Sequence, residues 1–540
     1  MLLWHALVMF EMATMLVPVV GAVALLLVSL VLQSKRKSTI AKYPEPSIIP
    51  FSSEEIIRNP HECFMHGFRH YGQVFRYYCN GSFRYMVSKE LTERVLTEDT
   101  TFSFELGVAK ALKINLVHCF RGGTFYSDID ALVTEVTAKR LKSIIPKISP
   151  IFQRNAAELV RMHGNEPFDP IPYLQKTVAE AVAIIIFGNE IARTCNPDLI
   201  VDIAEGMAKA TGMFQNQSRW GGKFPTLYSF YKLSGSRRTE LILIHLIWRF
   251  GREIGPTVWA ALSKSSNSPR DSKDADDINS TVLAVLARKL ASKTGHLSIP
   301  SKLWAIVLSW VFIFASVHQT VVIMTYVVFE LARHPECQES IVLANLSPSS
   351  PLTIDSLRDA IHTESFIREV LRMKGEAITT VRSPRHDIEL AGYFIPKGSL
   401  LHPMVYPSNR SPEYTTNPDT FDGMRWTQSR KLATTTGPGH LSFGLGRWAC
   451  PGRFLAVAGE FSLSLSELRT TDNATKLTQN PYLEIKLVIL TLLAQADLEL
   501  VDGEFALADK LNIVGTPPRG RVVMKRRIRT GTRTSEVGMD

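Results

Sequence analysis

The sequence predicts a mainly α-helical protein with a minor β-sheet region, preceded by an N-terminal transmembrane helix. Three observations support this fold class. Apolar residues recur at mostly helical spacing from about residue 51 to residue 260, a long apolar stretch occupies 301–336, and β-like alternation is limited to short runs such as QVFRYYC and FRYMVS. With 540 residues the chain exceeds the ~250–300 residues of one hydrophobic core, so we expect two domains or one large fold with a long internal helix.

The N-terminal segment has the pattern of a membrane anchor. No residue between Glu11 and Gln33 is charged, which approaches the ~20 apolar residues that span a bilayer, and a Lys-Arg-Lys run follows as the expected cytoplasmic flank. The segment lacks the basic start and the small-residue cleavage site of a signal peptide. We therefore expect an uncleaved anchor at 1–34, a Pro-rich linker at 35–50, and a single-pass protein of the endoplasmic reticulum whose folded part lies in the cytosol.

Composition excludes several classes of protein. The formal net charge is +10, but the basic residues are dispersed and are not interleaved with aromatic residues. We therefore expect no nucleic-acid partner and favour a membrane surface or an acidic protein. The six cysteines form no CxxC pair, which argues against a disulfide framework or a structural zinc site and favours a reducing compartment.

The apolar stretch 301–336 has two interpretations. No residue between Lys302 and Glu330 is charged, so its length would suit a second transmembrane helix. Its middle is polar, however, at 316 and 318–320, and polar side chains are costly in lipid. A helix that is apolar all round can equally form the buried axis of a large protein, and we favour this interpretation.

Helical and β patterns alternate in the later part of the chain. TESFIREVLRMKG, 363–375, has helical spacing, and LEIKLVILTLL, 483–493, is a strongly apolar helix. Between them, DIELAGYFIPKGSLLHPM, 387–404, alternates like two strands paired around the turn Pro396-Lys397-Gly398. We therefore expect a small, locally paired sheet within a helical protein.

Cys450 lies among glycines in the run LSFGLGRWACPGRF, 441–454. A thiolate is a strong, soft ligand for iron and, as an axial ligand of haem, promotes O–O cleavage. Such a ligand needs N–H groups turned toward sulfur, close approach of the chain to a flat macrocycle, and an apolar cover. Gly446 and Gly452 permit the close approach, and Phe443 supplies the cover. The alternative, a buried structural cysteine in a glycine-rich turn, fits this spacing less well.

Four motifs together carry a resemblance to a known family. FGLGRWACPGRF resembles the haem-binding signature of the cytochromes P-450, in the variant common among fungal membrane-bound members. Glu369-Val-Leu-Arg372 resembles the family's ExxR motif. FDGMRW, 421–426, resembles the segment that supplies the third charged partner of that motif, here Arg425. ASVHQT, 315–320, resembles the oxygen-binding kink of the long central helix. The motifs follow the family's order, and the resemblance covers nearly all of the chain after the anchor.

The resemblance implies a fold and a cofactor. It implies the cytochrome P-450 fold, with its long central helix, over residues 51–530, and a polar tail at 531–540. It also implies that haem b, iron protoporphyrin IX, binds with Cys450 as the axial ligand of the iron.

The resemblance further assigns roles to charged residues. Glu369, Arg372 and Arg425 would form a rigid structural network beneath the cysteine loop, since the first two lie one turn apart on a helix. Arg382, or less favourably Arg385, resembles the arginine that neutralises a haem propionate.

Trp448 departs from the family pattern. Many relatives carry a propionate-binding arginine or histidine at this position, whereas an indole N–H donates without a charge. We therefore expect haem anchoring to depend on Arg382 and Arg447.

The central helix departs from the pattern as well. Relatives commonly place an acid and then a threonine where this chain has His318 and Gln319, followed by Thr320. The resemblance implies that these three residues handle oxygen and protons. A glutamine donates to oxygen but relays protons poorly, so water or Thr320 would carry them. Alternatively, the polar residues only satisfy one another within a buried helix.

Residues 457–482 interrupt the expected pattern. In relatives the cysteine loop runs within a few residues into a helix like 483–493, but here a polar, Ser/Thr-rich stretch intervenes. Because it interrupts a helix that should pack against the haem, we favour a translated intron over a genuine surface loop.

Taken together, the motifs predict a haem-thiolate monooxygenase that inserts one atom of O2 into an apolar small molecule. The resemblance suggests a terpenoid-type intermediate of fungal secondary metabolism, with electrons from NADPH delivered by NADPH-cytochrome P-450 reductase to a basic proximal face. We expect a lipophilic substrate, a membrane and the reductase as partners. The alternatives are a haem-binding protein impaired by 457–482, and a multi-span transporter that uses 301–336 as a second span.

Overall fold

The computed structural model describes residues 42–79, 81–112, 114, 123–139, 141–211, 237–265, 281–292, 296–346, 353–374, 380–453, 455, 484–512 and 515–527. Helices predominate in these ranges, which confirms the predicted mainly α-helical class with a minor β-sheet region. The α-helices are α2 (Ser53–Arg58), α3 (Pro60–Tyr71), α4 (Lys89–Thr97), α5 (Phe104–Ala111), α7 (Phe125–Lys139), α8 (Leu141–His163), α9 (Pro170–Thr194), α10 (Pro197–Thr211), α13 (Arg237–Glu253), α14 (Gly255–Ser265), α16 (Val282–Leu290), α17 (Ile299–Ile313), α18 (Thr320–Arg333), α19 (Pro335–Asn345), α20 (Ile354–Arg358), α21 (Ile361–Lys374), α22 (Val405–Asn409) and α24 (Glu484–Leu493). The shorter turns are the π-helical η4 (Phe314–Gln319) and the 3-10 turns η5 (Gly446–Trp448) and η8 (Val501–Gly503).

The strands form small sheets around the helical part. They are β1 (Val74–Cys79), β2 (Ser82–Val87), β3 (Phe102–Ser103), β4 (Ser383–Pro384), β5 (Ile388–Leu390), β6 (Tyr393–Ile395), β7 (Leu401–Pro403), β8 (Ala496–Leu500) and β9 (Val522–Arg526). Strand β2 pairs antiparallel with β1 and parallel with β7, while β3–β4, β5–β6 and β8–β9 are antiparallel pairs. Strands β1 and β2 confirm the two β-like runs seen early in the sequence.

The predicted strand pair around Pro396-Lys397-Gly398 is wrong. The hairpin closes earlier, between β5 and β6, at Ala391 and Gly392, whose φ angles are 52° and 82°. Two successive positive φ angles give a turn whose twist matches that of a two-residue hairpin. The strand after Gly398 is β7, which joins the distant β2. The alternating apolar and polar residues predicted the strands correctly. The backbone conformation at Ala391 and Gly392 determines which strands pair.

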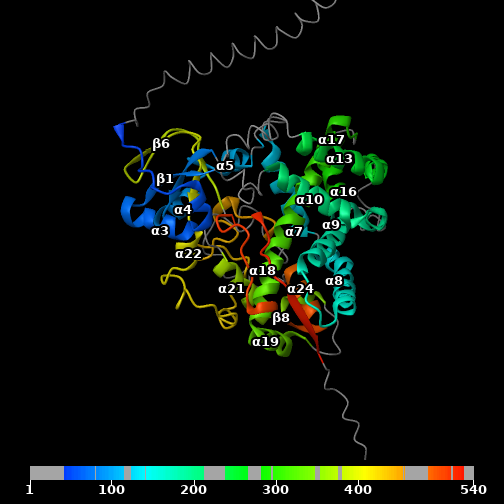
Figure 1. Ribbon diagram of the computed structural model, residues 1–540. Helices are drawn as coiled ribbons and strands as arrows, with labels where there is room; N and C mark the ends of the chain where they lie inside the picture. The colour runs from blue at the N-terminus through cyan, green and yellow to red at the C-terminus, as the bar shows by residue number, and fades with distance from the viewer. Residues whose placement is uncertain are drawn as a thin grey trace, which may run out of the picture.

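The long helix α17–η4–α18 runs through the core. Helix α18 packs against α9, α21, α24 and strand β8, and Figure 1 shows it in the middle of the molecule. By length and composition, Pro170–Thr194 and Ile299–Arg333 could each cross a membrane, but 61% and 50% of their most apolar windows are buried in the protein. This packing supports the buried axis that we expected at 301–336 over a second transmembrane helix.

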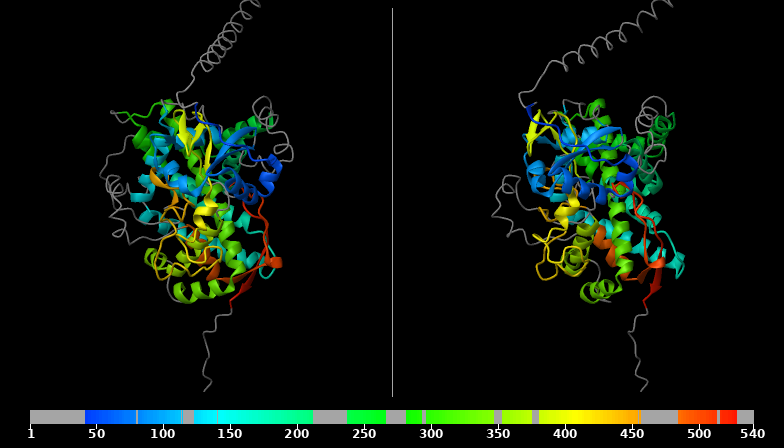
Figure 2. Two further views of the ribbon diagram at one scale, coloured as in Figure 1. Left: turned by 90° about the vertical axis from the view of Figure 1, so that its left-hand side faces the viewer. Right: turned by 60° about the vertical axis from the view of Figure 1, so that its left-hand side comes forward.

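The described chain begins and ends at opposite ends of the molecule. In both views of Figure 2 its first segments, in dark blue, lie toward the upper end with the β5–β6 hairpin, and β9, in red, lies at the lower end. The predicted anchor 1–34, the insertion 457–482 and the tail 531–540 lie outside the described residues, as does the first part of the linker, 35–41.

Candidate active site

The segment around Cys450 folds into a tight loop. The Cys450 N–H donates to the Phe443 carbonyl over 2.8 Å, which closes the loop on itself. On the other side, the Arg453 N–H and Nη1 both donate to the Cys450 carbonyl, over 3.3 Å and 2.7 Å. Because both backbone polar groups of the cysteine are bonded within the loop, the loop sets the direction of its side chain.

Cys450 is exposed, and hydrogen-bond donors lie close to its sulfur. The side chain is exposed, yet surrounding protein raises the pKa of the thiol, an effect that the Arg453 charge and the backbone N–H groups of Gly452 and Arg453 partly offset. A Cβ built on Gly452 would lie 3.7 Å from Sγ, so the chain passes close to the sulfur. Donors aimed at sulfur stabilise a thiolate bound to a metal cation. The loop therefore presents an accessible sulfur in the setting that an axial ligand needs.

Gly446 attaches this loop to the end of α4. Its φ is 73°, and a Cβ at this position would lie 3.1 Å from both the Leu96 carbonyl oxygen and the Thr97 Cγ2 atom. Both the backbone conformation and the close contact therefore favour glycine.

Arg382 is a buried cation close to the same corner of the fold. Its exposed fraction is 1%, and its Nη1 and Nη2 donate to the carbonyls of Val381 (3.1 Å) and Leu96 (3.2 Å). Among the described residues, its Nε has no hydrogen-bond partner. Burial lowers the pKa of the guanidinium to about 10, against the opposing effect of Asp99. A buried guanidinium with an unused donor is suited to bind a carboxylate.

Arg385, the other candidate, has a different environment. Its side chain is 42% exposed, its Nη2 lies 3.5 Å from Glu105 Oε2, and its Nε donates to the Asp99 carbonyl over 3.2 Å. An exposed arginine that already has an acidic partner is less suited to a buried carboxylate. The structure therefore favours Arg382 for this role.

Phe104 connects the predicted haem-anchoring residues. Trp448 stacks on Phe104 with ring centroids 5.1 Å apart, and the Arg382 guanidinium lies 5.2 Å from the same ring. The Arg447 guanidinium lies 4.5 Å from the Trp448 ring and its Nη1 is 3.7 Å from Asp130 Oδ2. The result is a stack of arginine, phenylalanine, tryptophan and arginine. Sequence reasoning missed Phe104, because no motif includes it.

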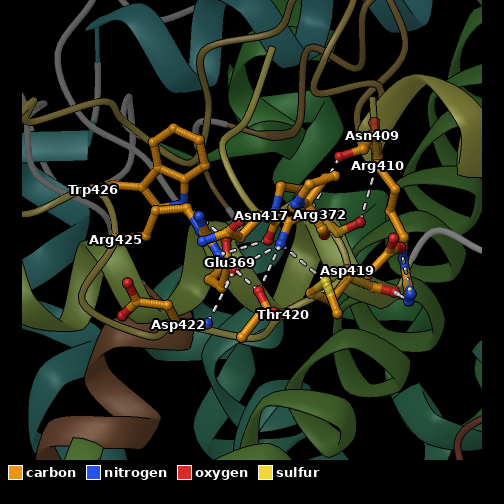
Figure 3. Close-up of polar contacts among 12 residues, drawn as sticks. Glu369, Arg372, Asn409, Arg410, Asn417, Asp419, Thr420, Asp422, Arg425 and Trp426 are labelled. Carbon is orange, nitrogen blue, oxygen red and sulfur yellow. Dashed lines mark hydrogen bonds and ion pairs between the residues drawn. The ribbon is translucent and has the colours of Figure 1, made fainter. Parts of the chain in front are cut away.

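Glu369, Arg372 and Arg425 meet at α21, as Figure 3 shows. Arg372 binds Glu369 through two bonds, Nη2 to Oε1 at 2.7 Å and Nε to Oε2 at 2.9 Å, and both side chains are fully buried. Arg425 Nε lies 3.0 Å from Glu369 Oε1. The structure therefore brings together the trio that the motifs predict.

Further donors complete the shell around Glu369. The Trp426 Nε1 donates to Oε2 over 3.1 Å, and the Asp422 N–H donates to Oε1 over 3.1 Å. Sequence reasoning missed both, although they lie within the same FDGMRW segment as Arg425. The arginines in turn donate to backbone carbonyls of the surrounding loop, at Asn409, Thr416, Asn417, Pro418 and Thr420 (Figure 3). The network thus fixes the loop between β7 and the cysteine segment onto α21.

Two further side chains of α21 hold the chain that leads to Cys450. Arg368 Nη1 donates to the carbonyls of Leu432 and Thr435, and Glu364 accepts from the Ala433 N–H. Glu364 also pairs with the buried Lys486 of α24, Nζ to Oε2 at 3.1 Å. Helix α21 therefore supports the segment before the cysteine and the helix that follows it in the fold. No sequence motif pointed to these residues.

The predicted oxygen-binding kink is a π-helical turn, η4. His318 is buried there, with its Nε2 3.1 Å from the Gly515 carbonyl and its ring stacked on Phe314 at 5.8 Å between centroids. Burial lowers the pKa of His318, against the opposing effects of the Gly515 carbonyl and Glu205. The ring is therefore neutral near pH 7 and bonded to the C-terminal segment.

The predicted catalytic residues of this helix have different environments. Gln319 is half-buried and Thr320 is buried, at 6% exposure. Within the turn, Ala315 is the exposed residue, and Ser316 is half-buried. Gln319 and Ser316 thus retain open surface in the middle of a core helix, whereas His318 does not.

The described residues fit a haem group. Cys450 offers a soft anionic ligand with N–H donors behind it, and Arg382 offers a buried donor suited to a propionate.

Comparison with known proteins decides the family. The model of the cytochrome P450 family matches residues 44–466, which is most of the chain. The chain belongs to the cytochrome P450 family. This family implies a haem cofactor, in agreement with the donor set around Cys450.

Individual cytochromes P450 match over shorter stretches. The cytochrome P450 monooxygenase paxP of Penicillium paxilli is 31% identical over 151 residues, 26% of this chain and 29% of that protein. The β-amyrin 11-oxidase of Glycyrrhiza uralensis is 24% identical over 385 residues, 68% of this chain and 70% of that protein. The chain matches only about a third of the length of five fungal and mammalian relatives in this family.

A solved cytochrome P450 has the same fold. The retinoic acid-bound cyanobacterial CYP120A1 aligns with a TM-score of 0.61 at 19% identity, over 90% of this chain and 100% of that chain. The expected cytochrome P450 fold is therefore confirmed.

Proposed function

We propose that this cytochrome P450 is a haem-thiolate monooxygenase that inserts one atom of O2 into an apolar small molecule. The observation that carries the proposal is the exposed residue Cys450, whose sulfur has backbone N–H groups directed at it in a closed loop. Haem bound to this sulfur would supply the iron at which O2 is activated.

We assign a separate role to each of the residues around the site. Cys450 would bind the iron, and Arg382 would hold a propionate, with Arg447 and Trp448 stabilising that side through the stack on Phe104. Gln319, the last residue of the π-helical turn, and Thr320, the first residue of α18, would orient O2 and move protons. The Glu369, Arg372 and Arg425 network keeps the cysteine loop rigid.

Partners and location follow from chemistry and composition. Electrons come from NADPH through NADPH-cytochrome P-450 reductase, an acidic flavoprotein that suits a chain with a net charge of +10. The protein is a single-pass protein of the endoplasmic reticulum membrane, anchored through 1–34, with the catalytic domain in the cytosol. Its substrate is a terpenoid-type intermediate of fungal secondary metabolism, supported by the match to β-amyrin 11-oxidase and to fungal monooxygenases.

The alternative is a haem-binding protein with impaired catalysis. It is favoured by the segment 457–482, which separates the cysteine loop from α24. We propose that this segment is a translated intron and that it is absent from the mature enzyme.

The carbon monoxide difference spectrum of the reduced protein tests both points. A strongly red-shifted Soret band from the chain as written would show thiolate ligation and would make the segment compatible with function. A band that appears only after deletion of 457–482 would support the intron proposal. Absence of the band from both forms would refute the haem-thiolate assignment.

A further inference from the structure

His318 lies where three parts of the fold meet. It belongs to the π-helical turn of the central helix, its Nε2 contacts the Gly515 carbonyl of the C-terminal segment at 3.1 Å, and helix α10 lies on the same turn. Helix α10 packs directly against this turn. Figure 1 shows α10 beside the long central helix.

The hydrogen bond fixes the form of the histidine ring. A carbonyl oxygen only accepts, so Nε2 must carry the proton in the neutral ring. The ring also stacks on Phe314, with a 14° angle between the planes. The proton on Nε2 is therefore engaged by a backbone carbonyl, and the ring has little freedom to turn.

The surroundings argue against a proton relay through this residue. A relay residue must exchange its proton with water or with the reacting group. The His318 side chain is 8% exposed, and its Nε2 proton is committed to a main-chain acceptor. Gln319, the neighbouring residue, has the more open surface.

Gly515 depends on this bond. The residue is buried, and its own N–H donates to the Asn512 carbonyl over 2.9 Å. Loss of the histidine donor would leave the buried Gly515 carbonyl without the partner that the structure gives it, a change that favours local opening.

We propose that His318 is a positioning residue that locks the C-terminal segment at Gly515 onto the turn of the central helix, and so shapes the space that a substrate enters. This proposal rests on the proposed function, since it assigns substrate positioning to the same site. It removes His318 from the proton pathway and leaves Gln319 and Thr320 to serve there.

Two substitutions of His318 distinguish a positioning role from a role as a proton relay. His318→Leu removes the donor, and His318→Gln keeps an N–H at the position of Nε2. His402→Leu is the matched control, because His402 is also buried, at 4% exposure, and has no hydrogen-bond partner among the described residues. All three are made in the full chain purified with haem.

Hydrogen exchange is the primary readout, because it does not depend on turnover. We expect His318→Leu to speed exchange of amides in the C-terminal segment 515–527 by ~10-fold or more, and His318→Gln and His402→Leu to leave this segment protected. Unchanged protection in His318→Leu would overturn the proposal. The proposal would also be overturned if His318→Gln lost protection to the same extent as His318→Leu.

Steady-state kinetics gives a second, independent readout. With any substrate that the enzyme oxidises, a positioning residue alters KM and the ratio of products, whereas a relay residue lowers kcat and enlarges the solvent isotope effect. A lowered kcat with an unchanged KM in His318→Leu would also refute the proposal. The carbon monoxide spectrum remains the separate test of the haem-thiolate assignment, so the two failures are distinguishable.

Discussion

Arg425 reaches from the loop before the cysteine segment to place its Nε 3.0 Å from Oε1 of Glu369 on α21. The same oxygen accepts from Arg372, which lies one helical turn further along and is fully buried. One carboxylate therefore pairs with two cations and connects a long loop to a helix. A buried charge that serves several partners is costly to remove.

We expect Glu369→Ala to lower the free energy of unfolding by about 3–5 kcal/mol, because it leaves Arg372 buried without a counter-charge. Urea unfolding followed by circular dichroism measures the change. The control is Glu54→Ala, since Glu54 pairs with Arg58 on an exposed helix surface, where we expect no measurable change. Equal effects from the two variants would contradict the structural role of the network.

We expect Arg382→Met to lower the haem content of the purified protein while the apoprotein remains folded. The guanidinium is buried without an acidic ion-pair partner among the described residues, so its removal costs the apoprotein little. The ratio of haem absorbance to protein, together with circular dichroism, reports both properties. Arg385→Met is the control and should retain haem, because Arg385 is exposed and paired with Glu105. Full haem content in Arg382→Met would argue against its role at a propionate.

We expect Gly446→Ala to weaken the red-shifted carbon monoxide band. An added Cβ would meet the Leu96 carbonyl oxygen at 3.1 Å in a backbone conformation with φ of 73°, so the loop must shift away from α4. Gly437→Ala is the matched control, since a Cβ at that position meets nothing within 4 Å and its φ is not positive. A normal band in both variants would show that the loop tolerates the shift.

Because Lys374 is buried, we expect the free energy of unfolding to depend on pH. Burial lowers its pKa from 10.5 to about 7. Between these values the unfolded chain binds a proton that the folded chain does not, so this group makes stability rise with pH, by about 1.4 kcal/mol per pH unit.

Lys374→Met should remove that rise. The variant is expected to be more stable than the parent at pH 7, with the difference shrinking toward pH 10. Denaturant unfolding at several pH values measures it, and Lys176→Met, at an exposed lysine paired with Glu158, should leave the slope unchanged. A parent protein with no slope between pH 7 and 10 would show that Lys374 is solvated in the folded state.

Part of the site could be predicted because its spacing is local. Glu369 and Arg372 lie three residues apart, and any helix places such a pair on one face, where the structure shows two hydrogen bonds between them. The approach of Arg425 came only from the family motif, because it is a long-range contact. The indole of Trp426 and the ring of Phe104 escaped prediction, since aromatic side chains are usual in any core and carry no positional signal.

The environment of His318 was not predictable for a physical reason. A π-helical turn carries more residues per turn than an α-helix, so it rotates the following side chains away from the faces that a 3.6-residue period assigns. The sequence marked the polar interruption at 316–320 correctly but could not show that His318 would face Gly515. The partner of β7 was missed similarly, because the conformations of Ala391 and Gly392 ended the hairpin before Pro396.

The parallel pairing of β2 with β7 constrains how the protein is made. Tyr85 aligns with Leu401, so the outer edge of the β1–β2 hairpin stays unpaired until the ribosome has passed β7. At ~5–20 residues per second, this interval lasts roughly 15 s to 1 min. An open strand edge next to a nascent chain is a site for mispairing and aggregation. The early hairpin therefore has to be shielded during synthesis, and the yield of folded enzyme depends on chaperones acting in that interval.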